Sequence, residues 1–286
     1  RLNCLTALAV NYMPGVKSSN RQPFIVTTVR ALMTRTLPRR DFIKNSKVIK
    51  LGQQTAPEAL QRHWVDIGYQ AAEVVLEPGQ FSRRGGLLDV WAPAENLPVR
   101  LEFFGDEIDT LRCFDPATQR TVQSIEQILI TPAREFLPGK AVDIPEGQVD
   151  EFYLPLLHPS PVSLLEYLPS NAIVVASDFS MLASPANEVE ERAVKDRQDS
   201  IREGTLNASF PVPYVTWSEI RDNISRRQYL EMGHALSEDT LHDDTIVDGK
   251  SLSNSFTPGP RFGGRMKQVM EYIAEAVQKG DRVVII

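Results

Sequence analysis

The chain has 286 residues, of which 42% are apolar and 24% charged, an ordinary globular composition for a protein of two domains or more. Its formal net charge of −6 argues against wholesale wrapping of nucleic acid, and two distant cysteines, Cys4 and Cys113, exclude a disulfide framework. Because the sequence has neither an apolar run long enough to span a bilayer nor a secretory signal, we expect a cytoplasmic protein.

The first part of the chain predicts helix, strand and helix in alternation, which is typical of an α/β layer architecture. The run Pro23–Thr28 is short, apolar and β-branched, as buried parallel strands are. A helix is expected to follow over residues 29–36. A further helix is expected from Thr55 onwards, with Thr55 as its N-cap and Pro57 in its first turn.

A basic cluster overlaps this region, and Asp41 is the only acid within it. Its members are Arg30, Arg35, Arg39, Arg40, Lys44, Lys47 and Lys50. Such a cluster can bind a DNA backbone with salt-dependent affinity, or it can form a solvated protein face. Since Phe42 is the only nearby aromatic residue that could stack on bases, the sequence favours the solvated face, and DNA binding stays open as an alternative.

Residues 68–120 predict a run of short strands joined by turns. Turns are expected at the dipeptides Pro78-Gly79 and Gly85-Gly86, because glycine allows the backbone conformations that tight turns need. Along the strand at 98–104 alternate residues share a face. One face carries Val99, Leu101 and Phe103, and the other carries Arg100, Glu102 and Phe104. Phe104 therefore shares its face with two charges.

Three motifs in this stretch occur in a fixed order: G-x-F-x-x-R-G-G-x-x-D-x-W, then P-V-R-x-E-F-F-G-D-E-I, then F-D-x-x-T-Q-R. Together they resemble the segment shared by the excision-repair protein UvrB and the bacterial transcription-repair coupling factor (Mfd). A long ordered string of motifs with fixed spacing matches by chance far less often than a short motif, so the resemblance is specific. The resemblance is close from Gly68 to Arg120 and weaker from Arg1 to about Asp178. It implies that this segment is a UvrA-binding domain.

Carried over position by position, the resemblance implies that Arg84, Arg100 and Phe104 bind UvrA. Arginines and exposed aromatic residues often dominate protein interfaces, which fits this assignment. The competing interpretation is structural: the arginines pair with Asp89 or Glu102 on a solvated face, and Phe104 covers a neighbouring loop.

No catalytic, cofactor-binding or metal-ligating residues are predicted. The strand at 172–176 runs into Ser177-Asp178, where the corresponding UvrB element resembles a Walker B strand ending in two acids. Only one acid is present, and no G-x-x-x-x-G-K-[ST] phosphate loop occurs. The glycine-rich run Gly259–Gly264 indicates a linker, and the four histidines lack metal-ligand spacing.

The remaining sequence predicts three helices. One begins at Ser184-Pro185 and ends at Gly204, one is capped by Ser218, and the third follows a polar linker at 237–260. A final buried strand is expected at 282–286. Because the sequence starts within a helical pattern and stops at a strand, we interpret it as an excised fragment.

These patterns predict an α/β fold: a degenerate UvrB-like, P-loop-type body with an inserted strand-rich UvrA-binding domain. The body comprises residues 1–66 and 132–254, the inserted domain residues 67–131, and a further domain starts within 255–286. The resemblance implies a parent protein that is an ATP-dependent DNA translocase using ATP and magnesium and acting on RNA polymerase and double-stranded DNA. This chain would only recruit UvrA, without being an enzyme or holding a cofactor.

The alternative is a fragment of a UvrB-type excision-repair helicase whose ATP site lies partly outside the sequence. We prefer the coupling factor because the acidic pair is missing at Ser177-Asp178 and because Thr131–Phe136 leads quickly into the next α/β unit.

Overall fold

A computed structural model of the chain describes residues 1–16, 23–138, 154–158, 160–212, 214–232, 262–263 and 265–280. The chain divides into two compact units, Arg1–Met232 and Gly233–Ile286. The described part of the second unit holds one helix, α8 (Met266–Gln278), and its side chains are exposed or partly exposed. All the other elements belong to the first unit.

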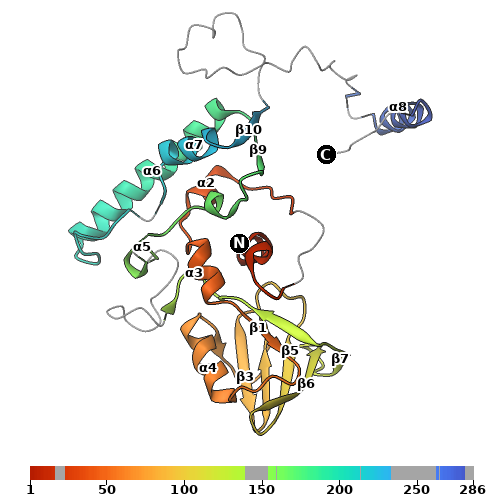
Figure 1. Cartoon of the computed structure of the whole chain (residues 1–286). Coiled ribbons are helices and arrows are strands. Elements are labelled where there is room, and N and C mark those ends of the chain that lie inside the picture. The colour runs from red at the N-terminus through yellow and green to blue at the C-terminus, as the bar shows by residue number, and fades with distance from the viewer. Residues whose placement is uncertain are drawn as a thin grey trace, which may run out of the picture. The chain divides into compact units, whose positions relative to one another are not determined.

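Helices and strands are interspersed along the first unit (Figure 1). The helices are α1 (Leu2–Ala9), α2 (Val29–Met33), α3 (Arg39–Lys44), α4 (Pro57–Asp66), α5 (Leu154–Leu157), α6 (Phe179–Arg202) and α7 (Trp217–Ser225), with short 3₁₀ turns η1 (Val10–Tyr12) and η4 (Leu164–Tyr167). The strands are β1 (Lys47–Lys50), β2 (Gln70–Ala71), β3 (Gln80–Arg84), β4 (Leu87–Val90), β5 (Val99–Phe104), β6 (Glu107–Phe114), β7 (Thr121–Ser124), β8 (Gln127–Ile130), β9 (Ile173–Ala176) and β10 (Gln228–Glu231). The predicted mixed α/β class is confirmed.

Six of the strands form one sheet in the order β2-β3-β4-β5-β6-β7. From β3 to β7 neighbouring strands are antiparallel, and β2 joins β3 in parallel. Tight turns connect β3 to β4 and β5 to β6, and in them Gly85 and Gly105 have φ of 60° and 62°. Glycine adopts these angles without strain, so the predicted strand run closes into hairpins.

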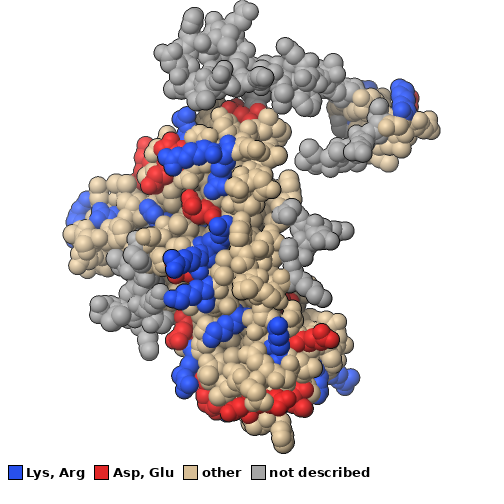
Figure 2. All heavy atoms as spheres, viewed as in Figure 1, with Lys and Arg blue, Asp and Glu red and all other residues tan. Residues whose placement is uncertain are grey.

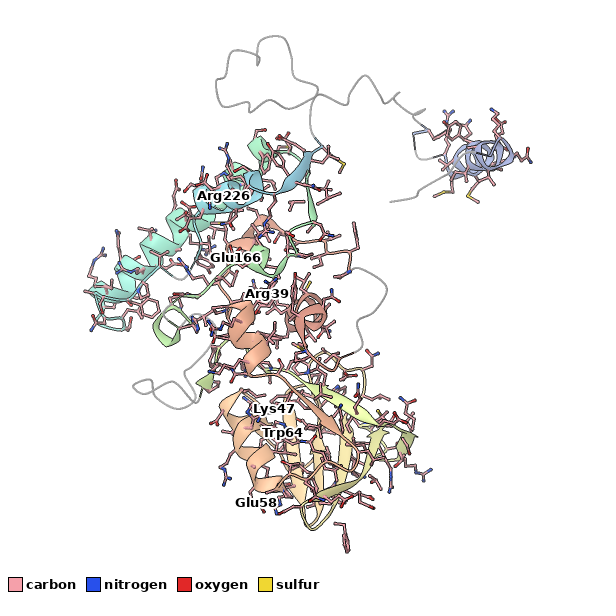
Figure 3. All side chains as sticks on the ribbon, viewed as in Figure 1. Arg39, Lys47, Glu58, Trp64, Glu166 and Arg226 are labelled. Carbon is pink, nitrogen blue, oxygen red and sulfur yellow. The ribbon has the colours of Figure 1, made fainter. Side chains whose placement is uncertain are left out.

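Helix α4 covers one face of this sheet (Figure 1). Its Trp64 is completely buried and points toward the strands (Figure 3), with its ring 5.8 Å from that of Phe81 and 6.2 Å from that of Tyr69. The same core includes Ile49 of β1, a strand that pairs with β8 in a separate two-stranded sheet. The core therefore takes in residues before the predicted boundary at 66/67, and the domain boundaries stay a prediction.

The burial of His63 on α4 can be tested by measuring how the stability of the protein changes with pH. Its Nε2 is buried and has no hydrogen-bond partner among the described residues. Desolvation, and then the charge of Lys47, lower the pKa of His63 below its usual 6.5. The unfolded chain therefore binds this proton more readily, and stability is lost as pH falls below 6.5.

We expect the His63→Gln variant to lose less stability than the wild type between about pH 7.5 and about pH 5.5, a range that brackets the ordinary imidazole pKa. Urea unfolding of both proteins at the two pH values measures the difference. An equal or larger loss in the variant would show that His63 is not the desolvated group.

Two further cores lie in the first unit, one joining α1, α3 and η4 and the other packed around α6 and α7. The core around α6 and α7 includes Met33, Trp217, Ile220 and Ile224, all buried. A capping box begins α7, since Thr216 accepts from the Glu219 amide and the Glu219 carboxylate accepts from the Thr216 amide. In the part of the chain that the structure describes, no helix is both long and apolar enough to cross a membrane.

Two predictions of buried strands are corrected. Residues Pro23–Thr28 form no strand, and Phe24 and Val26 are 92% and 84% exposed. The segment 173–176 is a strand as predicted, but β9 pairs in parallel with β10 in a sheet of two strands, and Ile173 and Val175 are exposed. Apolar β-branched runs favour extended backbone, but they do not specify what covers it.

Helix starts also differ from the predicted ones. Ala56 rather than Thr55 precedes α4, although Pro57 does lie in its first turn. Helix α6 starts at Phe179 and continues through Pro185, and α7 starts at Trp217 rather than after Ser218. The strand predicted at 282–286 and most of the Gly259–Gly264 run lie outside the described residues.

Candidate protein-docking face

The sheet face opposite α4, called the outer face here, carries all three predicted site residues. Strand pairing places Asp89 opposite Arg100, and Arg100 opposite Arg112. In the next row across the sheet, Arg84 lies opposite Leu87, which in turn lies opposite Glu102. Thr110 lies on the other side of Glu102. Residues directly opposite, or two apart along a strand, share a face. The pairing of β5 with β6 shifts register between Glu102 and Phe103. Because Phe103 still packs against the core, Phe104 points outward, on the side of Arg84 and Arg100.

Asp89 joins the two arginines. Its Oδ1 accepts from Arg100 Nε at 2.7 Å, and its Oδ2 accepts from Arg100 Nη2 at 2.8 Å and from Arg84 Nη2 at 2.9 Å. The carboxylate is only 2% exposed, whereas the side chains of Arg100 and Arg84 are 16% and 47% exposed. A buried carboxylate requires this compensation, and here two guanidinium groups supply it.

The turn formed by the F-D-x-x-T-Q-R motif supports Arg100. Asp115 Oδ1 accepts from the Thr118 amide, from the Thr118 hydroxyl and from the Ala117 amide, and these bonds lower the pKa of Asp115. Gln119 has a positive φ of 58° and accepts from Arg100 Nη2 at 3.3 Å. Arg100 also lies over the Phe114 ring, 4.6 Å from its centroid. Its hydrogen bonds to Asp89 raise the pKa of Arg100, so its charge is fixed at physiological pH.

Phe104 ends β5 at the turn into β6 and is 82% exposed. Its neighbour Phe103 points the other way and packs against the sheet core. An exposed phenyl ring gains nothing in the free protein from its apolar area, but it can supply contact area to a partner. The competing interpretation, in which Phe104 covers a neighbouring loop, does not agree with this exposure.

A second ion pair lies beside the first. Glu102 Oε2 accepts from Arg112 Nη2 at 2.7 Å and from Thr110 Oγ1 at 2.9 Å, and both charged side chains are about a third exposed. The outer face therefore presents paired charges around one exposed aromatic residue. Exposed apolar anchors within a polar rim are typical of protein interfaces.

Sequence reasoning missed the organising role of Asp89 and the contributions of Gln119 and Arg112. The sequence indicates Asp89 only as a possible ion-pair partner of the arginines, and that pairing is present. The R-G-G-x-x-D spacing was the available signal, because a two-glycine turn returns the chain so that residues 84 and 89 share a face.

Asp178 and the basic cluster, two other features of the sequence, lie outside the six-stranded sheet. Asp178 caps α6, since its Oδ1 accepts from the Ser180 amide at 2.8 Å and the Met181 amide at 3.3 Å. Figure 2 shows Lys and Arg side chains gathered over α3 and its surroundings, the region of the basic cluster. Within the described ranges, no group of three His, Cys, Asp or Glu side chains could hold a metal ion.

Comparison with known proteins identifies the same region. Residues 48–136 match the family described as the UvrB interaction domain. Over 117 residues the chain is 44% identical to the transcription-repair-coupling factor of Myxococcus xanthus and 39% identical to that of Escherichia coli, which is 41% of this chain and 10% of each relative. The UvrABC system protein B of Gloeothece citriformis is 32% identical over 117 residues, 41% of this chain and 17% of that protein.

The chain thus spans a tenth to a fifth of the length of these curated relatives. A longer match, 27% identical over 225 residues, reaches 64% of this chain in the Bacillus subtilis transcription-repair-coupling factor. The resemblance drawn from the three motifs is confirmed. Together the matches support an N-terminal UvrB-like module of the kind present in transcription-repair-coupling factors, with a UvrB interaction domain at residues 48–136.

Proposed function

We propose that this chain is the UvrA-recruiting module of a transcription-coupled repair factor and that the outer face is where UvrA docks. The match to the UvrB interaction domain covers every strand of the six-stranded sheet. The outer face combines an exposed phenyl ring with charged side chains that are held in place before any partner arrives. Preorganised side chains lose less conformational freedom on binding, which favours affinity.

Phe104 carries the proposal. A phenyl ring that is 82% exposed, at the end of a rigid strand and on the same face as two arginines, has the character of an interface anchor. Isolated exposed apolar residues are common on protein surfaces. Here the ring falls within the segment that matches an interaction domain, and this coincidence favours a docking role.

For the parent protein we propose an ATP-dependent DNA translocase that acts in the cytoplasm on stalled RNA polymerase, because relatives that match this chain at up to 44% identity are transcription-repair-coupling factors. ATP and magnesium would bind to other parts of that protein. The helix-capping role of Asp178 agrees with this division, since its carboxylate accepts backbone amides at the place where a Walker B acid would serve magnesium.

A UvrB-type helicase fragment is the second candidate. It rests on the match to the UvrABC system protein B, which is 32% identical where the coupling factors reach 44% over the same length. Saturable ATP binding by the chain extended at its N-terminus would favour this candidate over the first.

The test of the proposal is a pull-down of purified UvrA on the immobilised 286-residue chain. We expect retention of UvrA by the wild-type chain and loss of retention when the free chain is added as competitor. For substitutions on the outer face, an Arg83→Ala chain is the matched control and should retain UvrA like the wild type. Arg83 adjoins Arg84 but pairs with Glu58 and Gln61 of α4, on the opposite side of the sheet. No retention by the wild-type chain would overturn the proposal.

A further inference from the structure

The two arginines of the outer face are not equivalent. Arg100 uses its Nε–H and both Nη2 hydrogens, with two bonds to Asp89 and one to Gln119. Its guanidinium also lies over the Phe114 ring, and its side chain is 16% exposed. An arginine has five N–H donors, so only the two on Nη1 remain for a partner. Arg100 cannot pair with a partner through both guanidinium edges unless it leaves Asp89.

Arg84 has the opposite arrangement. Among the described residues it makes one hydrogen bond, from Nη2 to Asp89 Oδ2 at 2.9 Å, and its side chain is 47% exposed. Four of its five N–H donors therefore make no hydrogen bond to the described residues. A planar guanidinium with one edge open is suited to bidentate pairing with a carboxylate.

Position along the strands separates the two arginines further. Arg84 ends β3 and Phe104 ends β5, and both lie at the hairpin end of the sheet, beside Gly85 and Gly105. Arg100 lies near the start of β5, four residues before Phe104 on the same face. Asp89 is buried beneath both guanidinium groups, so a docked protein would meet Arg84 and Phe104 rather than this carboxylate.

We infer that Arg84 and Phe104 make the contact with UvrA, and that Arg100 is a positioning residue which fixes Arg84 through the shared carboxylate of Asp89. The inference rests on the proposed function. The recognised surface of UvrA then offers a carboxylate for Arg84 next to an apolar pocket for Phe104. Arg100 acts on binding only through the orientation of Arg84.

A double-mutant cycle on UvrA affinity tests this division of roles. Arg84→Ala is expected to weaken binding about tenfold, and Arg100→Ala about as much in the wild-type background, but Arg100→Ala adds little in the Arg84→Ala background. If instead the two losses multiply to about a hundredfold, Arg100 contacts UvrA directly and the inference is wrong. Calorimetric titration of UvrA with each variant gives the four affinities.

Arg100→Lys keeps the charge and loses the two-pronged bond to Asp89, so it replaces Arg100→Ala in the cycle if that variant does not fold. The salt dependence of UvrA affinity is an independent readout. Arg84→Ala should reduce this dependence, and adding Arg100→Ala to the Arg84→Ala chain should leave it unchanged. If Arg84→Ala and Phe104→Ala both bind UvrA like the wild type, the proposed docking face itself fails. If both weaken binding and the arginine losses multiply, only the positioning role fails.

Discussion

Replacing Phe104 with alanine is expected to weaken UvrA binding by at least about tenfold while leaving the free energy of unfolding nearly unchanged. The side chain is 82% exposed, so its removal opens no cavity and takes little packing from the free chain. In the complex the same ring would be fully desolvated in a pocket of the partner. Calorimetric titration with UvrA and urea unfolding measure the two quantities on the same preparation.

The control for this variant is Val65→Ala. Val65 is a 52% exposed apolar residue on α4, the helix that covers the other face of the sheet. We expect wild-type UvrA affinity from it. Equal losses in the Phe104 and Val65 variants would mean that the effect comes from general loss of apolar surface rather than from the outer face.

Replacing Asp89 with alanine is expected to reduce both stability and UvrA binding. The carboxylate is 2% exposed and compensates two guanidinium groups, one of which is mostly buried. Removing one member of a buried ion pair leaves an uncompensated charge and costs about 3 kcal/mol, the lower end of the usual range because Arg100 keeps Gln119. Binding falls as well, since Arg84 loses its only hydrogen bond among the described residues.

Glu102→Ala is the control for Asp89→Ala, because it also removes an ion-paired carboxylate but from a more exposed position. Glu102 pairs with Arg112 on the same face, but both side chains are about a third exposed. Its removal is expected to cost less than about 1 kcal/mol, as for other solvent-accessible pairs. Urea unfolding of the two variants decides the matter: a stability loss for Asp89→Ala no larger than that for Glu102→Ala would contradict the central role of Asp89.

Much of the sheet was predictable because its signals are local. Alternation along β5 correctly assigned Val99 and Leu101 to the core and Arg100 and Phe104 to the outer face. The Gly85-Gly86 turn was equally readable, since only the backbone requirement of a tight hairpin is involved.

What failed depended on distant contacts. Pro23–Thr28 has the composition of a buried strand, yet Phe24 and Val26 are exposed, because composition does not specify a neighbouring strand. The predicted start of α6 at Ser184-Pro185 was wrong, because Asp178 caps the helix and it begins at Phe179. The difference between Arg84 and Arg100 depends on the register of two hairpins and on Gln119, which no local pattern contains.

Site-specific photocrosslinking tests the docking of UvrA on the outer face most directly. A photoreactive phenylalanine analogue at position 104 would keep an aromatic group at the end of β5, and the same analogue at position 65 would report from α4. Covalent UvrA adducts are predicted from position 104 and not from position 65. Adducts from position 65 alone would contradict the assignment of the docking face.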